Sequence, residues 1–189
     1  SHNRIMVIEI MGHKAGWLAL YAGIAGGSDV IIIPEIPYRI EAIAEHLLER
    51  RKKGKHFSVI AFAEGAVSFS EKDMNKKALK EARKSMVGSI GYRVAGEIEA
   101  ATGADARVTV LGYLQRGGTP SGYDRILATR FGAAAAEFAA TEQYGVMTAL
   151  QQGGITAVPL SKVADKVKKV PEDHPMIRAA LDVGTCLAG

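Results

Sequence analysis

Residues 112–124 read Gly-Tyr-Leu-Gln-Arg-Gly-Gly-Thr-Pro-Ser-Gly-Tyr-Asp, and they join an apolar run to an alanine-rich helical pattern. The apolar run Val108–Leu111 predicts a strand that leads into this stretch. The glycines let the backbone come close to a ligand, and Arg116 carries a planar fork of N–H donors suited to phosphate or carboxylate. A strand end, a glycine-rich loop and a forked cation together predict an anion site in an α/β sheet. The alternative interpretation is a glycine-rich turn with a solvated arginine.

Short apolar runs alternate with helical patterns along the rest of the chain. The predicted strands are Ile5–Met11, Val30–Ile33, Phe57–Ala63, Arg107–Leu111 and Val146–Leu150. The predicted helices are Trp17–Ala25, Arg39–Lys53, Lys76–Ala101, Tyr123–Glu142 and Ser161–Val170. This alternation implies right-handed βαβ units, so the predicted fold class is α/β, with a parallel sheet flanked by helices. The composition becomes richer in alanine after Gly118, which suggests a boundary between residues 1–118 and residues 119–189.

Composition narrows the classes of protein to which the chain can belong. The net charge of +4 is modest and scattered, so we expect no nucleic-acid partner. The single cysteine, Cys186, excludes an internal disulfide and fits a reducing compartment. No apolar stretch reaches the ~20 residues that cross a bilayer, so we expect a cytoplasmic protein without a membrane partner. The chain starts at Ser1 without an initiator methionine, which suggests a piece of a longer polypeptide.

Polar side chains follow three of the predicted strands. In open parallel sheets, ligands bind beyond the carboxyl ends of the strands. His13 follows the first strand and Glu64 the third, while Tyr113, Gln115 and Arg116 follow the fourth. A carboxylate accepts hydrogen bonds from sugar hydroxyls, and arginine and tyrosine bind phosphate, so this edge predicts a polyol-phosphate site. The alternatives are a loop histidine and a structural glutamate. The sequence contains no metal-ligand spacing.

Three other charged features have structural explanations. Arg4 and Arg107 open strands at the opposite, amino ends, where a solvated arginine is the favoured interpretation within one subunit. Glu9 interrupts an apolar strand, which predicts a buried carboxylate with a partner. The basic cluster Arg50–His56 closes a predicted helix, where it is either a solvated helix end that complements the dipole or a local anion site.

Several motifs together closely resemble the bacterial-type 6-phosphofructokinases. They are Ile8–Trp17, Ile33–Glu35, Val110–Pro120 and Tyr123–Arg125. The resemblance runs in order over essentially the whole chain and matches the C-terminal half of that enzyme. It implies two Rossmann-like α/β lobes, of which residues 1–118 would form the sugar-phosphate (acceptor) lobe. Residues 119–189 would supply segments that return to pack on the nucleotide lobe, together with a C-terminal tail.

The resemblance also implies a site for fructose 6-phosphate. Six residues match family positions that meet this substrate: the loop residues Met11, Gly12 and His13, the hydroxyl-binding Glu64, and the phosphate-binding Tyr113 and Arg116. Two more, Arg4 and Arg107, match arginines that reach the same phosphate from a neighbouring subunit, so the resemblance implies a homo-oligomer with shared substrate sites. Three further residues match positions of an effector site in allosteric bacterial members: Asp29, Lys53 and Lys55.

The resemblance leaves the phosphoryl donor open between ATP and pyrophosphate. His13 stands where the family usually has arginine, and Tyr113 stands where many ATP-dependent members have histidine. His13 removes a fixed positive charge near the transferred group, and Tyr113 is more similar to some pyrophosphate-using relatives. His13 is the candidate in this half for stabilising the transition state. The donor-phosphate loop, the catalytic Thr-Ile-Asp segment and most of the Mg²⁺ binding belong to the other half, so no metal ligand is expected here.

The expected function is therefore that of an enzyme half. The full-length enzyme would transfer a phosphoryl group to the 1-hydroxyl of fructose 6-phosphate in glycolysis, and the chain alone would be inactive because phosphoryl transfer needs positioned donor phosphates and Mg²⁺. The alternative is a non-catalytic module that senses sugar phosphates or binds an effector.

Overall fold

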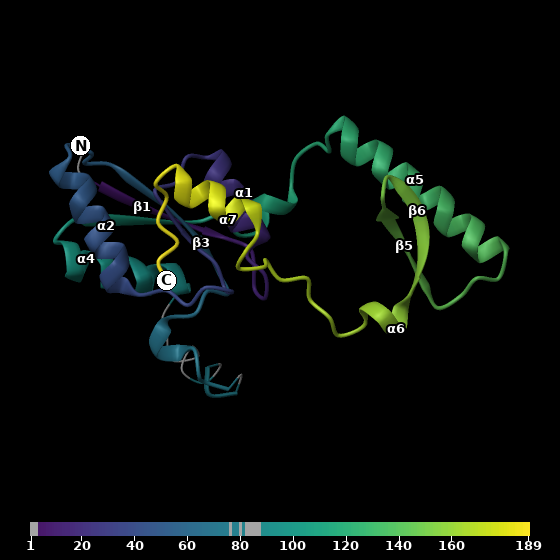
Figure 1. The fold of residues 1–189 in the computed structure, drawn as a ribbon, viewed down its shortest axis with the longest axis horizontal. Coiled ribbons are helices and arrows are strands. Elements are labelled where there is room, and N and C mark those ends of the chain that lie inside the picture. Colours follow the sequence, from purple (N-terminus) through teal and green to yellow (C-terminus); the bar gives the residue numbers. More distant parts are fainter. Residues whose placement is uncertain (1–3, 76, 80, 82–87) are drawn as a thin grey trace. The chain divides into compact units, whose positions relative to one another are not determined.

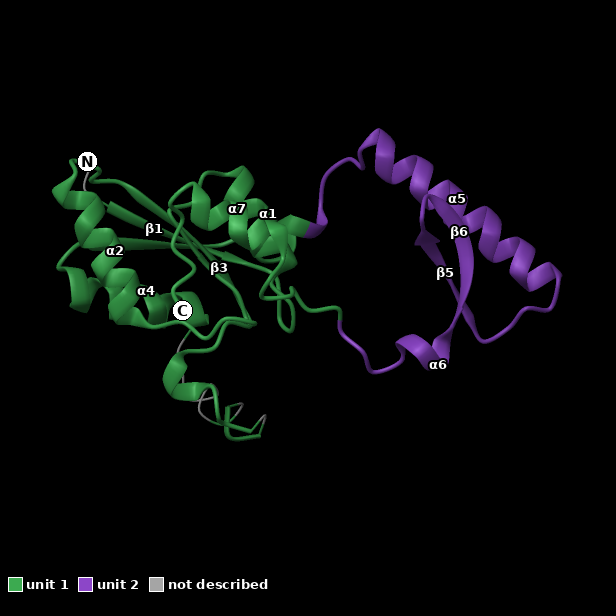
Figure 2. Ribbon diagram, in the orientation of Figure 1, with its two compact units in different colours: residues 1–115, 168–189 green, residues 116–167 purple. Residues whose placement is uncertain are grey.

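The computed structural model describes residues 4–75, 77–79, 81 and 88–189, which fall into two compact units (Figures 1 and 2). Unit 1 comprises residues 1–115 and 168–189, and unit 2 comprises residues 116–167. The structure divides the chain between Gln115 and Arg116, close to the boundary expected after Gly118. It also assigns residues 168–189 to unit 1, although the sequence grouped them with residues 119–167. None of the described helices is long and apolar enough to cross a bilayer.

Unit 1 is built on a four-stranded parallel sheet in the order β2-β3-β1-β4. Its strands are β1 (Arg4–Ile10), β2 (Val30–Ile32), β3 (Ser58–Ala63) and β4 (Asp105–Val110). Its longer helices are α1 (Trp17–Ala25), α2 (Ile40–Lys52), α4 (Ile90–Thr102) and α7 (Pro175–Asp182). The predicted α/β class with a helix-flanked parallel sheet is confirmed.

The strands alternate their side chains between two buried clusters, one on each face of the sheet. In β2, Val30 and Ile32 join the cluster with α2 and α4, whereas Ile31 joins the cluster with α1 and α7. In β3, Ile60 and Phe62 also join the cluster with α2 and α4. This period of two with both faces apolar explains why the central strands read as continuous hydrophobic runs.

The C-terminal segment returns to the sheet edge beside β2. Cys186 bridges Val30 in parallel register, the amide of Ile31 donates to the Cys186 carbonyl at 2.9 Å, and Cys186 donates to the Asp29 carbonyl at 3.0 Å. Earlier in the segment, the indole Nε1 of Trp17 donates to the Lys168 carbonyl at 2.7 Å. The helix predicted over Ser161–Val170 is wrong in length, because only α6 (Leu160–Val163) is helical and the residues from Lys168 onward belong to unit 1. Helix α7 was not predicted.

Unit 2 contains α5 (Gly122–Ala140) and an antiparallel hairpin of β5 (Val146–Gln151) and β6 (Gly154–Pro159). The prediction that Val146–Leu150 joins the parallel sheet is wrong, because β5 pairs with β6, a strand the sequence did not predict. Gln152 and Gly153 form the connection, and both have positive φ (49° and 82°), as a two-residue type I′ turn requires. No residue of unit 2 is fully buried, and all of this unit is described.

The long helix predicted over Lys76–Ala101 is not continuous in the structure, because Gly88 and Ser89 are not helical, although residues 77–79 and 81 are. Part of that range, residues 76, 80 and 82–87, lies outside the described residues, and α4 begins only at Ile90. The carboxylate of Glu9 in β1 accepts the amide hydrogen of Gly91 at 2.8 Å, and a Cβ on Gly91 would lie 2.7 Å from that oxygen. Glu9 is 7% exposed, so the predicted buried, partnered carboxylate is confirmed, and it satisfies an amide in the first turn of α4.

Candidate functional site

The loop that follows β1 is held by side chains from both neighbouring strand ends. The amide of Gly12 donates to Oε1 of Glu64, just after β3, at 3.3 Å. The amide of Met11 donates to Oε1 of Gln115 at 3.1 Å. Gln115 lies in η2 (Gly112–Arg116), the 3₁₀ turn after β4. Because β3 and β4 flank β1 on opposite sides, the structure gathers Met11, Gly12 and Glu64 at the carboxyl edge of the sheet, as the sequence predicted.

The residue after Glu64 passes very close to the same loop. A Cβ built on Gly65 would lie 2.0 Å from the carbonyl oxygen of His13 and 2.7 Å from that of Gly12. These are backbone atoms, so they cannot rotate away as the end of a side chain could. A glycine at position 65 is therefore required for the close approach of the two strand ends.

Replacing Gly65 with alanine is expected to lower the free energy of unfolding by about 1–3 kcal/mol, since the added methyl group forces the loop backbone to shift. Denaturant unfolding of the purified protein measures this change. Gly96→Ala is the matched control. It also replaces a glycine with alanine, inside α4, but a Cβ at position 96 meets no atom within 4 Å. Equal stability of the Gly65→Ala protein and the parent would contradict the close approach.

Three of the side chains predicted for the acceptor site are exposed. His13 is exposed, and Tyr113 is 84% exposed. Arg116, the first residue of unit 2, is exposed at the end of η2. Within the described part of the chain, neither the Tyr113 hydroxyl nor the Arg116 guanidinium has a hydrogen bond or ion pair. Glu64 uses Oε1 for the Gly12 amide, which leaves Oε2 without a partner among the described residues.

The two arginines at the amino ends of the strands meet on one carboxylate. Oδ2 of Asp105 lies 3.2 Å from Nε of Arg4 and 3.1 Å from Nη2 of Arg107. The three side chains are 40–58% exposed. The seven residues of β1 span roughly 20 Å, so neither arginine reaches the Glu64 end within one chain. The sequence prediction missed Asp105, although its i, i+2 spacing from Arg107 places both side chains on one face of a strand.

The predicted effector residues are only partly assembled. The Asp29 carboxylate pairs with Arg50 at 2.6 Å and accepts the Val59 amide hydrogen at 2.9 Å. Lys53 and Lys55 are exposed just beyond the end of α2. No ion pair joins either lysine to Asp29 within the described ranges. The basic last turn of α2 complements the helix dipole, and its member Arg50 binds Asp29, a role that the sequence did not reveal.

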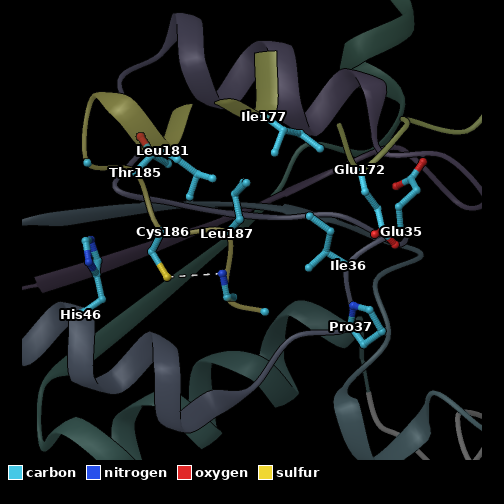
Figure 3. Close-up of a pocket in the computed structure, with 13 residues that line it drawn as sticks. Glu35, Ile36, Pro37, His46, Glu172, Ile177, Leu181, Thr185, Cys186 and Leu187 are labelled. Atoms are coloured by element: carbon cyan, nitrogen blue, oxygen red, sulfur yellow. Dashed lines mark hydrogen bonds between the residues drawn. The ribbon is translucent and has the colours of Figure 1, made fainter. Parts of the chain in front are cut away.

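A cavity of about 630 Å³ lies between the C-terminal segment and the region after β2 (Figure 3). In Figure 3, His46 and Cys186 are drawn at one end, and Glu35 and Glu172 at the other. Burial lowers the pKa of His46 and raises the pKa of the Cys186 thiol. Oε1 of Glu35 accepts the amide hydrogens of Gly16 and Val170 at 3.1 and 2.9 Å, which ties the returning segment to the start of α1.

A second cavity, of about 800 Å³, adjoins a partly buried ion pair. Arg93 of α4 binds the Glu71 carboxylate and donates to the Tyr38 hydroxyl at 2.9 Å. The hydrogen bond from Arg93 holds the pKa of Glu71 at about 2, and burial raises the pKa of Tyr38 to about 12. The guanidinium of Arg93 compensates the charge of Glu71, which is 6% exposed. None of the residues predicted for the acceptor site lines either cavity.

Comparison with known proteins gives consistent matches. A family model described as Phosphofructokinase matches residues 1–139. The chain is 59% identical to an ATP-dependent 6-phosphofructokinase of Spirochaeta thermophila, over 98% of the chain and 51% of the relative. It is 48% identical to the ATP-dependent 6-phosphofructokinase of Propionibacterium freudenreichii subsp. shermanii, over 98% of the chain and 54% of that protein.

A similar solved structure is the pyrophosphate-dependent phosphofructokinase from Marinobacter aquaeolei. The TM-score is 0.70 at 26% identity, and the match covers all of this chain and 50% of that one. The chain thus spans about half the length of the relatives it matches.

Proposed function

This chain belongs to the phosphofructokinase family, and from that membership we propose that it is the acceptor-binding half of a 6-phosphofructokinase. The full-length enzyme, which carries this chain together with a nucleotide lobe, transfers a phosphoryl group to the 1-hydroxyl of fructose 6-phosphate. The observation that carries the proposal is the loop Met11–His13, held at the carboxyl edge of the sheet by Glu64 and Gln115. Ligands of parallel α/β sheets bind at that edge.

Each open side chain at this edge has a role in the proposal. Glu64 holds the loop with Oε1 and accepts a sugar hydroxyl with Oε2, because an ionised carboxylate has acceptor capacity on both oxygens. Tyr113 and Arg116 bind the 6-phosphate, and the guanidinium fork supplies charge-assisted hydrogen bonds. His13 lies beside the transferred group and is the candidate for stabilising its charge.

The donor and its metal are assigned to the other half. Nowhere in the described part of the chain do three or more His, Cys, Asp or Glu side chains form a group that could hold a metal ion. We propose that Mg²⁺ is bound mainly by the other half, and that the isolated chain is inactive because phosphoryl transfer needs positioned donor phosphates and Mg²⁺. Unit 2 packs on the nucleotide lobe in this proposal, which is supported by the absence of any fully buried residue in that unit.

Three residues form the proposed effector site. Lys53 and Lys55 are exposed cations that an anionic effector could contact. Asp29 contributes through Arg50, which its carboxylate binds.

We expect the full-length enzyme to convert fructose 6-phosphate with ATP. Two relatives, at 59% and 48% identity, are named ATP-dependent, which outweighs the preference for pyrophosphate suggested by Tyr113 and the weaker fixed charge at His13. Parallel assays with ATP and with pyrophosphate decide between the donors. Turnover with pyrophosphate alone would reverse the donor assignment. Binding of fructose 6-phosphate without product from either donor would instead support the alternative, a non-catalytic sugar-phosphate sensor.

A further inference from the structure

We propose that Gln115 is a positioning residue that sets the acceptor loop against the phosphate-binding turn, an inference that rests on the proposed function. Its amide bridges two backbone segments. Oε1 accepts the amide hydrogen of Met11 at 3.1 Å, and Nε2 donates to the carbonyl of Gly112 at 3.1 Å. One end of the bridge is the loop after β1, and the other is the first residue of η2.

The bridge uses a property that few side chains have. A primary amide presents an acceptor and a donor on adjacent atoms, and here each of them meets a backbone group that needs it. Gln115 is half-buried, so water competes only in part for these groups. Both polar atoms are engaged with protein, in contrast to Glu64, which keeps one oxygen free. Gln115 therefore acts through its neighbours and not by contact with substrate.

The neighbours of Gln115 explain why its position matters. Tyr113 and Arg116 belong to the same short turn, and Met11 belongs to the loop that Glu64 holds from the other side. Releasing the amide frees the turn from the loop while the β1–β3 contact stays in place. Small misplacements of groups that bind substrate have large kinetic effects. Here the misplaced groups bind the sugar phosphate, so the effect should appear in the kinetics with fructose 6-phosphate and not in the kinetics with the donor.

The test is Gln115→Glu in the full-length enzyme. The introduced carboxylate keeps an acceptor for the Met11 amide but sets a second oxygen against the Gly112 carbonyl, so two acceptors face each other. We expect the Michaelis constant for fructose 6-phosphate to rise about tenfold near neutral pH, with the constant for ATP unchanged. Gln152→Glu, an exposed change at the hairpin turn of unit 2, is the matched charge control.

The pH profile separates positioning from a general loss of structure. When the introduced carboxyl is protonated it again donates to the Gly112 carbonyl, so the defect relative to the parent enzyme should shrink as the pH falls towards 5. Gln115→Met has neither donor nor acceptor, so its defect should stay constant with pH. A Gln115→Glu defect that does not change with pH, or an equal rise in the constant for ATP, would overturn the inference. An inactive parent enzyme would instead contradict the proposed function itself.

Discussion

Replacing Arg116 with alanine in the full-length enzyme is expected to raise the Michaelis constant for fructose 6-phosphate ten- to a hundredfold. Loss of a charge-assisted hydrogen bond costs ~1.5–3 kcal/mol, and a factor of ten corresponds to about 1.4 kcal/mol. Arg116 is exposed and makes no hydrogen bond or ion pair within the described residues. Its removal should therefore weaken substrate binding without leaving a protein group unpaired.

Steady-state kinetics with each substrate varied in turn measures this effect. The constant for ATP should stay the same, since the donor lies on the other lobe in our proposal. Arg178→Ala is the control, because it removes an arginine of α7 whose side chain is 78% exposed and whose ion pair with Asp182 lies within one helix. An unchanged constant for fructose 6-phosphate would remove Arg116 from the acceptor site.

Mixing two variants that each bind fructose 6-phosphate weakly is expected to restore activity at low concentrations of this substrate. In our proposal Arg4 and Arg107 serve the site of a neighbouring subunit, because they lie at the strand ends remote from Glu64. A hybrid of an Arg107→Ala subunit and an Arg116→Ala subunit then contains one site that keeps both arginines. Such a reciprocal arrangement is what an isologous interface produces.

The measurement compares the mixture with each variant alone after subunit exchange. Hybrids are identified independently, for example by a tag on one subunit, so that absence of exchange is not mistaken for absence of rescue. If hybrids form and activity does not return, the shared site is wrong. Asp105 holds both arginines in the single chain, so a phosphate that binds them has to compete with, or share, that carboxylate.

Local pattern predicted the parts of the structure that depend on near neighbours. The apolar runs predicted the parallel strands of unit 1, and α1 was predicted over Trp17–Ala25, as observed. The polar residues after the strand ends indicated which side chains gather around the loop. These features follow from side-chain periodicity and from the common direction of parallel strands.

Features that depend on distant partners were not predicted. Which strands flank β1 is a matter of topology, so the sequence could not show that Gln115 reaches Met11. The start of α4 depends on Glu9, which lies far away in the sequence. Strand β6 depends on the positive φ of Gln152, an unusual residue for such a turn. The role of Asp105 as an ion-pair partner can be recognised only when Arg4 is known to lie opposite it in the sheet.

The return of residues 168–189 to the edge of the sheet has a consequence during synthesis on the ribosome. Thr185 bonds the carbonyl of Ser28, a residue made 157 positions earlier, and Cys186 pairs beside β2. Until the whole of unit 2 has been translated, the backbone groups of β2 on that side have no strand to pair with. Unpaired strand edges recruit other chains, and contacts between such distant residues form slowly. The nascent chain therefore passes through a stage prone to aggregation, and chaperones would have their greatest effect there.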